Sequence, residues 1–214
     1  MRTWRRIQPW LFLAAFALVA WLLINARGNL SRRGSSSPRQ DSSATAEEFL
    51  ARKERWAIKT GADDTAPALD ILHPAVASVR DLVALTPPEG RRREDREGAE
   101  DRAYVIDAKL LRFKQEEDDD DYHIVITDWS SPGPTMIVEI PDPDDVPDSS
   151  PWKSAIARAR TTFQTAFSPT HRFTRETGHI RVTGIGFFDF VHGQSGVAPN
   201  GIELHPVIKV EILD

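Results

Sequence analysis

Cysteine is absent from this chain of 214 residues. A disulfide framework, a zinc–thiolate site and a thiol nucleophile are therefore all excluded. Four enzyme signatures are absent as well: HExxH, GxSxG, the P-loop and the dinucleotide fingerprint. The sequence thus requires no cofactor and indicates no particular reaction.

Acidic residues are absent from the first forty positions, which carry seven arginines. Removing these seven from the 27 basic residues leaves 20 against 32 acidic residues, a net charge near −12 for residues 41–214 with His neutral. Such a charge repels phosphate backbones and provides no general gain from counterion release. We therefore expect no non-specific binding of nucleic acids.

The N-terminal segment 1–27 combines arginines with a long apolar run. Residues 10–24 contain no charged side chain, and arginines flank them on both sides. Arg6 and Arg27 enclose twenty residues, about the number that crosses a ~30 Å hydrocarbon core. This pattern is typical of a transmembrane segment or a signal sequence.

A cleaved signal sequence would end in small residues of an Ala-x-Ala-like pattern. The best candidate, Ile24-Asn25-Ala26, has a bulky residue where a small one belongs. We therefore expect a signal-anchor that binds the membrane through residues 7–26 as a single pass. Arginines on both sides leave the orientation undecided by charge alone, and we expect the remainder to be extracytoplasmic.

The next two segments connect the anchor to the main domain. Residues 28–44 are rich in Gly, Ser, Arg and Pro, which is the composition of a disordered linker. Residues 45–103 predict a helical extension, with helices over about 46–59 and 74–85. The run 90–102 is expected to be a solvated charged loop.

From residue 104 onward the pattern becomes typical of strands. Stretches rich in Val, Ile, Leu and Phe, separated by polar or Pro/Gly breaks, predict strands over 104–114, 123–128, 135–140, 179–190 and 202–213. Ser150-Pro151 predicts the start of a helix over about 151–167, with Trp152, Ile156 and Phe163 on one face.

Three strands, a helix and two strands are the element order of an OB-fold. We therefore expect a mainly β (α+β) domain over 104–214, an OB-fold-like five-stranded barrel with a helix between strands three and four. Gly184 and Gly186 suit the bulges of a small barrel. The alternative is an unrelated α+β sheet with the same order of elements.

Candidate site residues gather near one rim of such a barrel. Imidazoles and carboxylates there suit a divalent metal or general acid/base chemistry. The candidates are His123, Glu139, Asp142, Asp189, His192, Gln194, Asn200 and His205. The alternative is that these histidines are hydrogen-bonded structural groups. Convergence of the side chains within about 4–5 Å would favour a metal.

The acidic run 116–121 contains six adjacent carboxylates. It lacks the alternating ligands, the turn glycine and the terminal Glu of an EF-hand loop. We therefore expect a solvated hairpin tip between the first two strands.

Five sequence blocks resemble those of a family of uncharacterised bacterial proteins. The blocks are Trp56-Ala57-Ile58-Lys59-Thr60-Gly61, Asp119-Asp120-Asp121-Tyr122-His123, Thr135-Met136-Ile137-Val138-Glu139-Ile140-Pro141-Asp142-Pro143, Gly184-Ile185-Gly186-Phe187-Phe188-Asp189-Phe190 and Ala198-Pro199-Asn200-Gly201-Ile202-Glu203-Leu204-His205-Pro206-Val207. The resemblance implies no activity. It implies only that the blocks belong to one domain.

Three functions are compatible with the sequence. The first is a non-enzymatic, membrane-tethered binding module for a ligand, peptide or oligosaccharide. The second is a metal-dependent hydrolase, such as a phosphodiesterase or nuclease, but few basic residues lie near the candidate site to stabilise a phosphoryl transition state. The third is a structural subunit of an envelope complex.

Overall fold

The structure, a computed structural model, describes residues 55–89, 95–191 and 193–213. The expected anchor 7–26, the linker 28–44 and most of the helix expected over 46–59 lie outside these residues. No helix in the described ranges is both long enough and apolar enough to cross a membrane.

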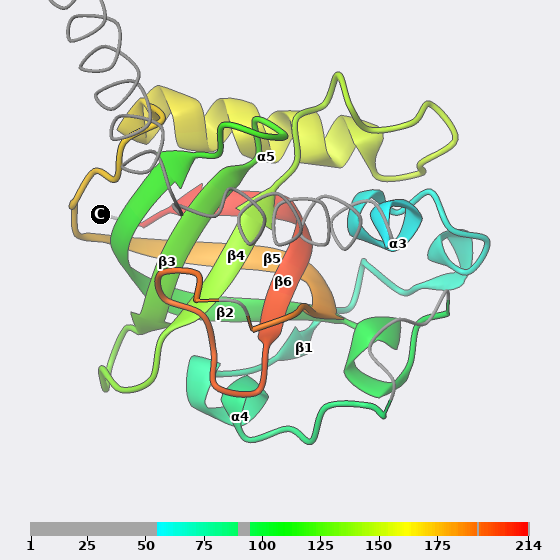
Figure 1. Cartoon of the computed structure of the whole chain (residues 1–214), viewed down its shortest axis with the longest axis horizontal. Coiled ribbons are helices and arrows are strands. Elements are labelled where there is room, and N and C mark those ends of the chain that lie inside the picture. Colours follow the sequence, from blue (N-terminus) through cyan, green and yellow to red (C-terminus); the bar gives the residue numbers. More distant parts are fainter. Residues whose placement is uncertain (1–54, 90–94, 192, 214) are drawn as a thin grey trace, which may run out of the picture. The chain divides into compact units, whose positions relative to one another are not determined.

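Five strands close into a barrel (Figure 1). They are β2 (Ala103–Gln115), β3 (Tyr122–Asp128), β4 (Met136–Ile140), β5 (Gly178–Phe188) and β6 (Ile202–Ile212). Their order is β2-β3-β4-β6-β5, and β5 pairs back onto β2. Only β4 and β6 pair in parallel; the other four pairings in the barrel are antiparallel. The predicted closed barrel is confirmed, and its order is consistent with an OB-like barrel.

The two-residue period of β2 explains how the barrel obtains its core. Ile106, Ala108 and Leu110 are buried, whereas Asp107 between them is exposed. The register with β3 shifts between Leu110 and Arg112. Because of this shift, the side chain of Phe113 again points into the core, where it is completely buried.

Helix α5 (Lys153–Phe167) packs across the barrel (Figure 1). Ile156, Ala159 and Phe163 recur at helical spacing and are buried. Phe163 meets Phe113 edge to face, with ring centroids 5.3 Å apart. The helix begins two residues later than expected, because Ser150 instead closes a turn: its Oγ donates to the carbonyl of Thr60 at 2.7 Å.

The glycines of β5 occupy bulges, as predicted. The register with β6 shifts on both sides of Gly184. A Cβ at Gly186 would overlap the backbone carbonyl of Ala99. Only glycine therefore allows the chain before β2 to lie this close to β5.

The extension before the barrel differs from its prediction. It contains α3 (Trp56–Thr60), a 3-10 turn η1 (Ala66–Ala68), the short strand β1 (Ala75–Val76), α4 (Val79–Val83) and a 3-10 turn η2 (Gly98–Asp101). The helix expected over 74–85 was too long. Its start becomes a strand because β3 ends opposite Ala108, which leaves that edge of β2 open to pair with β1 at Tyr104 and Val105.

The prediction of a solvated charged loop over 90–102 was wrong for two of its charged residues, whereas most of the others that the structure describes are exposed. Arg96 and Glu100 are buried in ion pairs with Asp63 and Arg55, respectively. Burial of these charges is tolerated because each has a partner of opposite sign.

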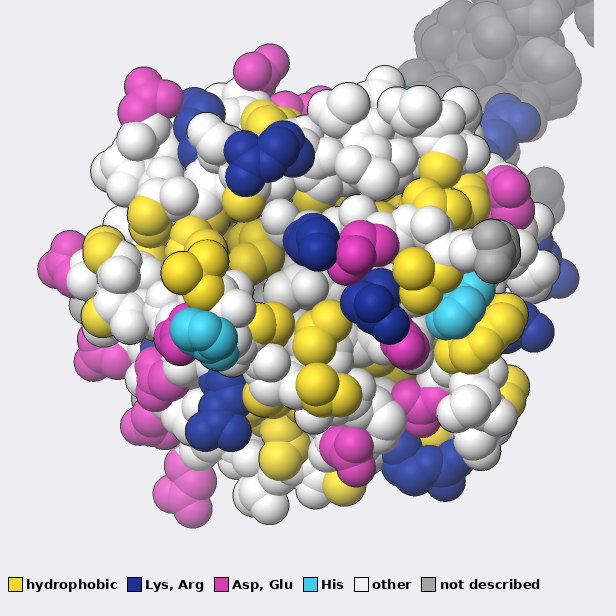
Figure 2. Space-filling model, turned by 180° about the vertical axis from the view of Figure 1, so that it is seen from behind, with side chains coloured by type: hydrophobic (Ala, Val, Ile, Leu, Met, Phe, Trp, Pro, Cys, Tyr) yellow, Lys and Arg dark blue, Asp and Glu magenta, His cyan; other side chains and the backbone are white. Residues whose placement is uncertain are grey.

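The surface does not concentrate charge of one sign on the face seen in Figure 2. Basic and acidic side chains lie beside each other there, among exposed apolar groups.

Candidate functional site

A polar network lies on the outer side of the barrel, on strands β3, β4 and β6. His123, Glu139, Glu203 and His205 alternate along these strands with residues that face the core, and so point to the opposite side. Their side chains are nevertheless almost fully covered. α3 and the loop between β5 and β6 contact this side of the barrel, through Lys59 and the Ser195 carbonyl.

Glu139 joins the two imidazoles. Its Oε1 is 3.0 Å from His123 Nδ1, and its Oε2 is 3.1 Å from His205 Nδ1. His205 Nδ1 is also 3.2 Å from Oε1 of Glu203. His123 Nε2 lies 3.0 Å from the Ser195 carbonyl, which fixes both nitrogens of that ring.

Asp121 completes the network from the hairpin between β2 and β3. Its Oδ1 accepts a hydrogen bond from the backbone N–H of Asp142 at 3.0 Å. Its Oδ2 faces His205 Nε2 at 3.5 Å, too far for a hydrogen bond. Neither of these two buried atoms has a hydrogen-bond partner within the described part of the chain.

Lys59 of α3 lies beside the network. Its Nζ is 3.1 Å from Asp189 Oδ2, and it lies 5.2 Å from the centre of the Phe187 ring. Burial alone would lower the pKa of Lys59, but the carboxylates of Asp189, Glu203 and Glu139 outweigh it and raise the pKa. Lys59 therefore remains charged.

The side chains of the network shift one another's pKa values. Burial alone would raise the pKa of Glu139, but hydrogen bonds from His123 and His205 hold it well below its usual range. Burial would lower the pKa of His205, yet its bonds to Glu139 and Glu203 raise it to about 9. Burial also raises the pKa of Asp121 to about 8 and that of Glu203 to about 7, each with help from neighbouring carboxylates.

Three members of the network could hold a cation. Asp121, Glu139 and His205 each offer one ligand atom, and the three atoms lie within 4.8 Å of one another. Asp121 and His205 are only 1 % exposed, so no substrate could touch them. The arrangement offers buried donors for a small ion or a proton.

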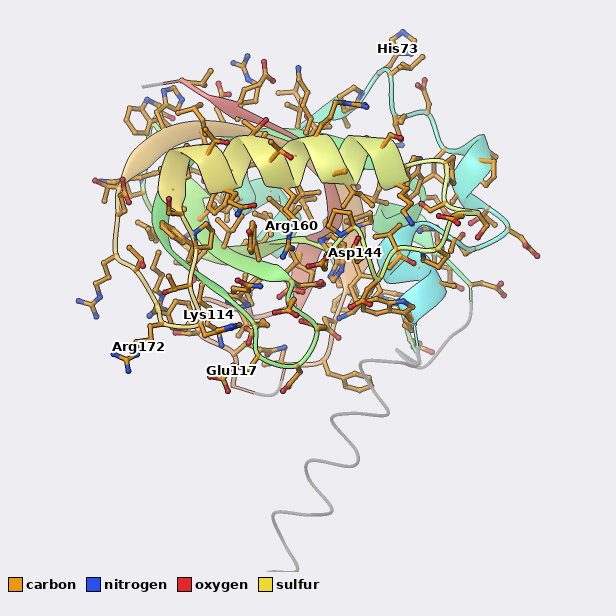
Figure 3. The ribbon with its side chains drawn as sticks, turned by 90° about the horizontal axis from the view of Figure 1, so that it is seen from above. His73, Lys114, Glu117, Asp144, Arg160 and Arg172 are labelled. Carbon is orange, nitrogen blue, oxygen red and sulfur yellow. The ribbon has the colours of Figure 1, made fainter. Side chains whose placement is uncertain are left out.

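The other predicted site residues lie around this network rather than in its centre. Asp142 Oδ2 accepts from Arg160 of α5 at 3.0 Å, and Figure 3 shows Arg160 on the barrel side of the helix. Asp189 pairs with Lys59. Gln194 donates to the Phe190 carbonyl at 3.1 Å and holds the loop. His192 lies outside the described residues.

Asn200 forms hydrogen bonds with the backbone at the end of α4. Its Nδ2 donates to the carbonyls of Leu82 and Leu85, at 3.0 Å each, and its Oδ1 accepts from the N–H of Ile202. These bonds tie the loop before β6 to the end of α4. Asn200 thus has a structural role in this geometry.

Sequence reasoning missed Asp121, Glu203 and Lys59. Asp121 was placed in a solvated acidic run, which is wrong for this residue, because its side chain is buried beneath the hairpin. One signal was available: Asp121 directly precedes the buried strand β3, two residues from His123. Glu203 also lies two residues from His205, between the apolar residues Ile202 and Leu204.

A groove of about 750 Å³ lies elsewhere, between β1, α4 and the turn after β3. Its lining includes Val76, Arg80, Asp107, Trp129, Ser131 and Arg181. Trp129 is 45 % exposed and stacks on His179, with ring centroids 4.0 Å apart and planes 3° from parallel.

The carboxylates of the groove are already engaged. Asp107 binds Arg181 at 2.6 Å, Asp81 binds Ser78, and Asp128 accepts from the first N–H groups of α4. Arg80, by contrast, forms no ion pair with any residue that the structure describes. Among the described residues, the groove therefore offers an aromatic surface and one guanidinium, that of Arg80, without an ion-pair partner.

Each of the five sequence blocks contributes a residue to the polar network or to its immediate surroundings. Lys59, Asp121, Glu139, Asp189 and His205 come from the five blocks in chain order. In comparisons with family models, with curated proteins and with solved structures, nothing matches this chain.

Proposed function

We propose that this protein is a non-enzymatic binding module on an OB-fold-like barrel, tethered to the membrane and holding a neutral oligosaccharide in the groove beside Trp129. The observation that supports it is the groove itself, in which a half-exposed indole lies beside polar side chains. Such pockets bind ligands by apolar contact and orient them with a few polar groups.

The charge of the groove favours an uncharged ligand. Arg80 and Arg181 nearly balance Asp81, Asp107 and Asp128, so an ion of either sign would gain little. Sugar rings present an apolar face that can stack on an indole, and their hydroxyls can accept from Arg80 and bond to Ser131. Oligosaccharides are also among the ligands that OB-folds bind, which is an argument by analogy.

A hydrolase is less well supported by the geometry. The histidines and carboxylates that would act on a substrate are buried beneath α3 and the loop before β6. A catalytic base must come within hydrogen-bond reach of the proton that it removes. Among the described residues that line the exposed groove there is no histidine, and His179 only stacks on Trp129.

The ligand is tested by titrating the full-length protein, in a detergent without sugar, with chitotetraose, cellotetraose and maltotetraose in a calorimeter. We expect saturable binding of at least one of them. Trp129→Ala should weaken this binding about tenfold, equivalent to about 1.4 kcal/mol. Phe173→Ala removes an exposed aromatic ring outside the groove and should have no effect.

Failure of all three sugars to bind would overturn the proposed ligand class, as would wild-type affinity in Trp129→Ala. The tether is tested separately. Full-length protein should remain in the membrane fraction after carbonate extraction, whereas a shortened chain beginning at Asp41 should be soluble. Recovery of intact full-length protein in the soluble fraction would contradict the tether.

A further inference from the structure

The two polar atoms without partners in the network face each other. Asp121 Oδ2 and His205 Nε2 are both buried, and neither forms a hydrogen bond within the described residues. A buried polar atom without a partner costs about 1–3 kcal/mol, so two such atoms aimed at one point require an explanation. An ion between them would satisfy both.

We propose that Asp121, Glu139 and His205 bind a divalent transition-metal ion of the zinc class, which pins the barrel closed. Tetrahedral ligands about 2.0–2.2 Å from zinc lie about 3.3–3.6 Å from each other. The separation of 3.5 Å between Asp121 Oδ2 and His205 Nε2 falls in this range. Glu139 is the third residue of the set: Asp121, Glu139 and His205 each offer one ligand atom within 4.8 Å of the others, and Glu139 Oε2 now lies 3.1 Å from His205 Nδ1.

The donor set favours zinc over the hard cations. Calcium and magnesium take oxygen ligands, in sets of six or more, whereas one imidazole with two carboxylates suits zinc or a neighbouring transition metal. The second nitrogen of the imidazole, Nδ1 of His205, lies 3.2 Å from Glu203 Oε1, so it would keep a carboxylate partner when Glu139 turns to the ion. A metal-binding histidine ordinarily has such a carboxylate partner, which orients the ring and directs its other nitrogen to the ion.

The location explains what the ion would do. β4 and β6 are joined by only two registered pairs, Ile137 with Glu203 and Val138 with Leu204. Glu139 and His205 come next on the two strands, and Pro206 then has no N–H with which to continue the pairing. A metal bound by Glu139 and His205 would thus extend the shortest junction of the barrel and attach the hairpin of Asp121 to it.

The site is separate from the groove of the proposed function. It is closed to large ligands, so the ion would contribute to folding rather than to catalysis. Trp129 and Arg80 do not belong to the network, so either proposal can fail without the other.

The test uses full-length protein in detergent, stripped with a chelator and then dialysed against Zn²⁺, Mn²⁺ or Ca²⁺ alone. Metal content is measured by mass spectrometry and affinity by competition with a chelating dye. We expect one Zn²⁺ per chain with the tightest binding, and a melting temperature that rises with the Zn²⁺ concentration. Asp121→Asn should weaken Zn²⁺ binding at least about 100-fold.

Asp120→Asn is the matched control, since it makes the same change one residue away. Asp120 accepts a bond from Gln115 that an asparagine can keep, and it is not in the site. Its Zn²⁺ affinity should equal that of the wild type. Circular dichroism of both variants shows whether they fold.

X-ray absorption at the zinc edge of the wild type provides a result that does not depend on any variant. One imidazole and otherwise oxygen ligands should surround the ion. Absence of saturable binding of all three ions, two or more imidazoles on zinc, or undiminished affinity in a folded Asp121→Asn variant would each overturn the proposal.

Discussion

Arg55 and Glu100 form a buried, two-pronged ion pair across 45 positions of the chain. Each terminal nitrogen of the guanidinium lies 2.7 Å from a different carboxylate oxygen. Glu100 Oε1 also accepts the backbone N–H of Phe188 at 3.0 Å, and the Arg55 guanidinium lies 4.6 Å from the centre of the Phe187 ring. The pair therefore attaches α3 and η2 to the end of β5.

Glu100→Ala should lower the free energy of unfolding by about 3–5 kcal/mol, because Arg55 would remain buried without its carboxylate. Asp107→Ala breaks the exposed pair with Arg181 and should cost less than about 1 kcal/mol. Urea unfolding of both variants measures the difference. Equal losses of unfolding free energy in the two variants would show that the buried pair of Arg55 and Glu100 matters no more for stability than the exposed pair.

Gly61 and Gly98 provide a second matched comparison. Both have positive φ, at +67° and +61°, but a Cβ at Gly61 would overlap the ring of Trp152, whereas nothing lies within 4 Å of one at Gly98. Gly98→Ala should therefore cost about 1–2 kcal/mol from its backbone alone. Gly61→Ala should cost about 1–3 kcal/mol more, from overpacking.

Thermal unfolding of the two glycine variants, followed by circular dichroism, measures these costs. If Gly61→Ala were as stable as Gly98→Ala, Trp152 would have to move aside without a loss of stability.

Asp63 should make stability depend on pH in acid. Burial alone would raise its pKa, but hydrogen bonds from Arg96 and Thr65 outweigh it and hold the pKa below its ordinary value. The folded state therefore binds this proton less readily than the unfolded state. The stability that Asp63 contributes is fully present above the unfolded pKa, about 3.9, and is lost as the pH falls through the folded pKa.

Urea unfolding between pH 5 and pH 2, about the range in which carboxylates titrate, measures this loss. Asp63→Asn should be less stable than the wild type at pH 5, and the difference should shrink toward pH 2. A difference that stays constant over this range would contradict the role of the Asp63 charge.

Asn200→Ala distinguishes a structural residue from a ligand-binding one. It removes the donor to Leu82 and Leu85 and the acceptor for Ile202. We expect a loss of about 1–3 kcal/mol in stability and no change in the affinity for zinc or for the sugars. Reduced affinity in a stably folded variant would place Asn200 in a binding site instead.

The alternation of buried and exposed side chains along single strands could be predicted from the sequence. β3 and β4 lie within one or two residues of their predicted bounds, and α5 follows its helical spacing, because each pattern depends on neighbours close in the chain. The element order likewise predicted the barrel. The sequence alone also indicated His123, Glu139 and His205 of the polar network, as separate imidazoles and a carboxylate.

Pairings across long separations were decided by the tertiary structure. The position of Asp121 next to strand β3 separates it from its five acidic neighbours, but its burial depends on the closure of the barrel, which brings β6 and His205 beneath the hairpin. The partners of Arg55 and Arg96 depend in the same way on how the chain before β2 packs on β5. Composition and periodicity determine which residues can be buried, whereas the partner of a buried charge depends on strand register and packing, since both bring distant residues together.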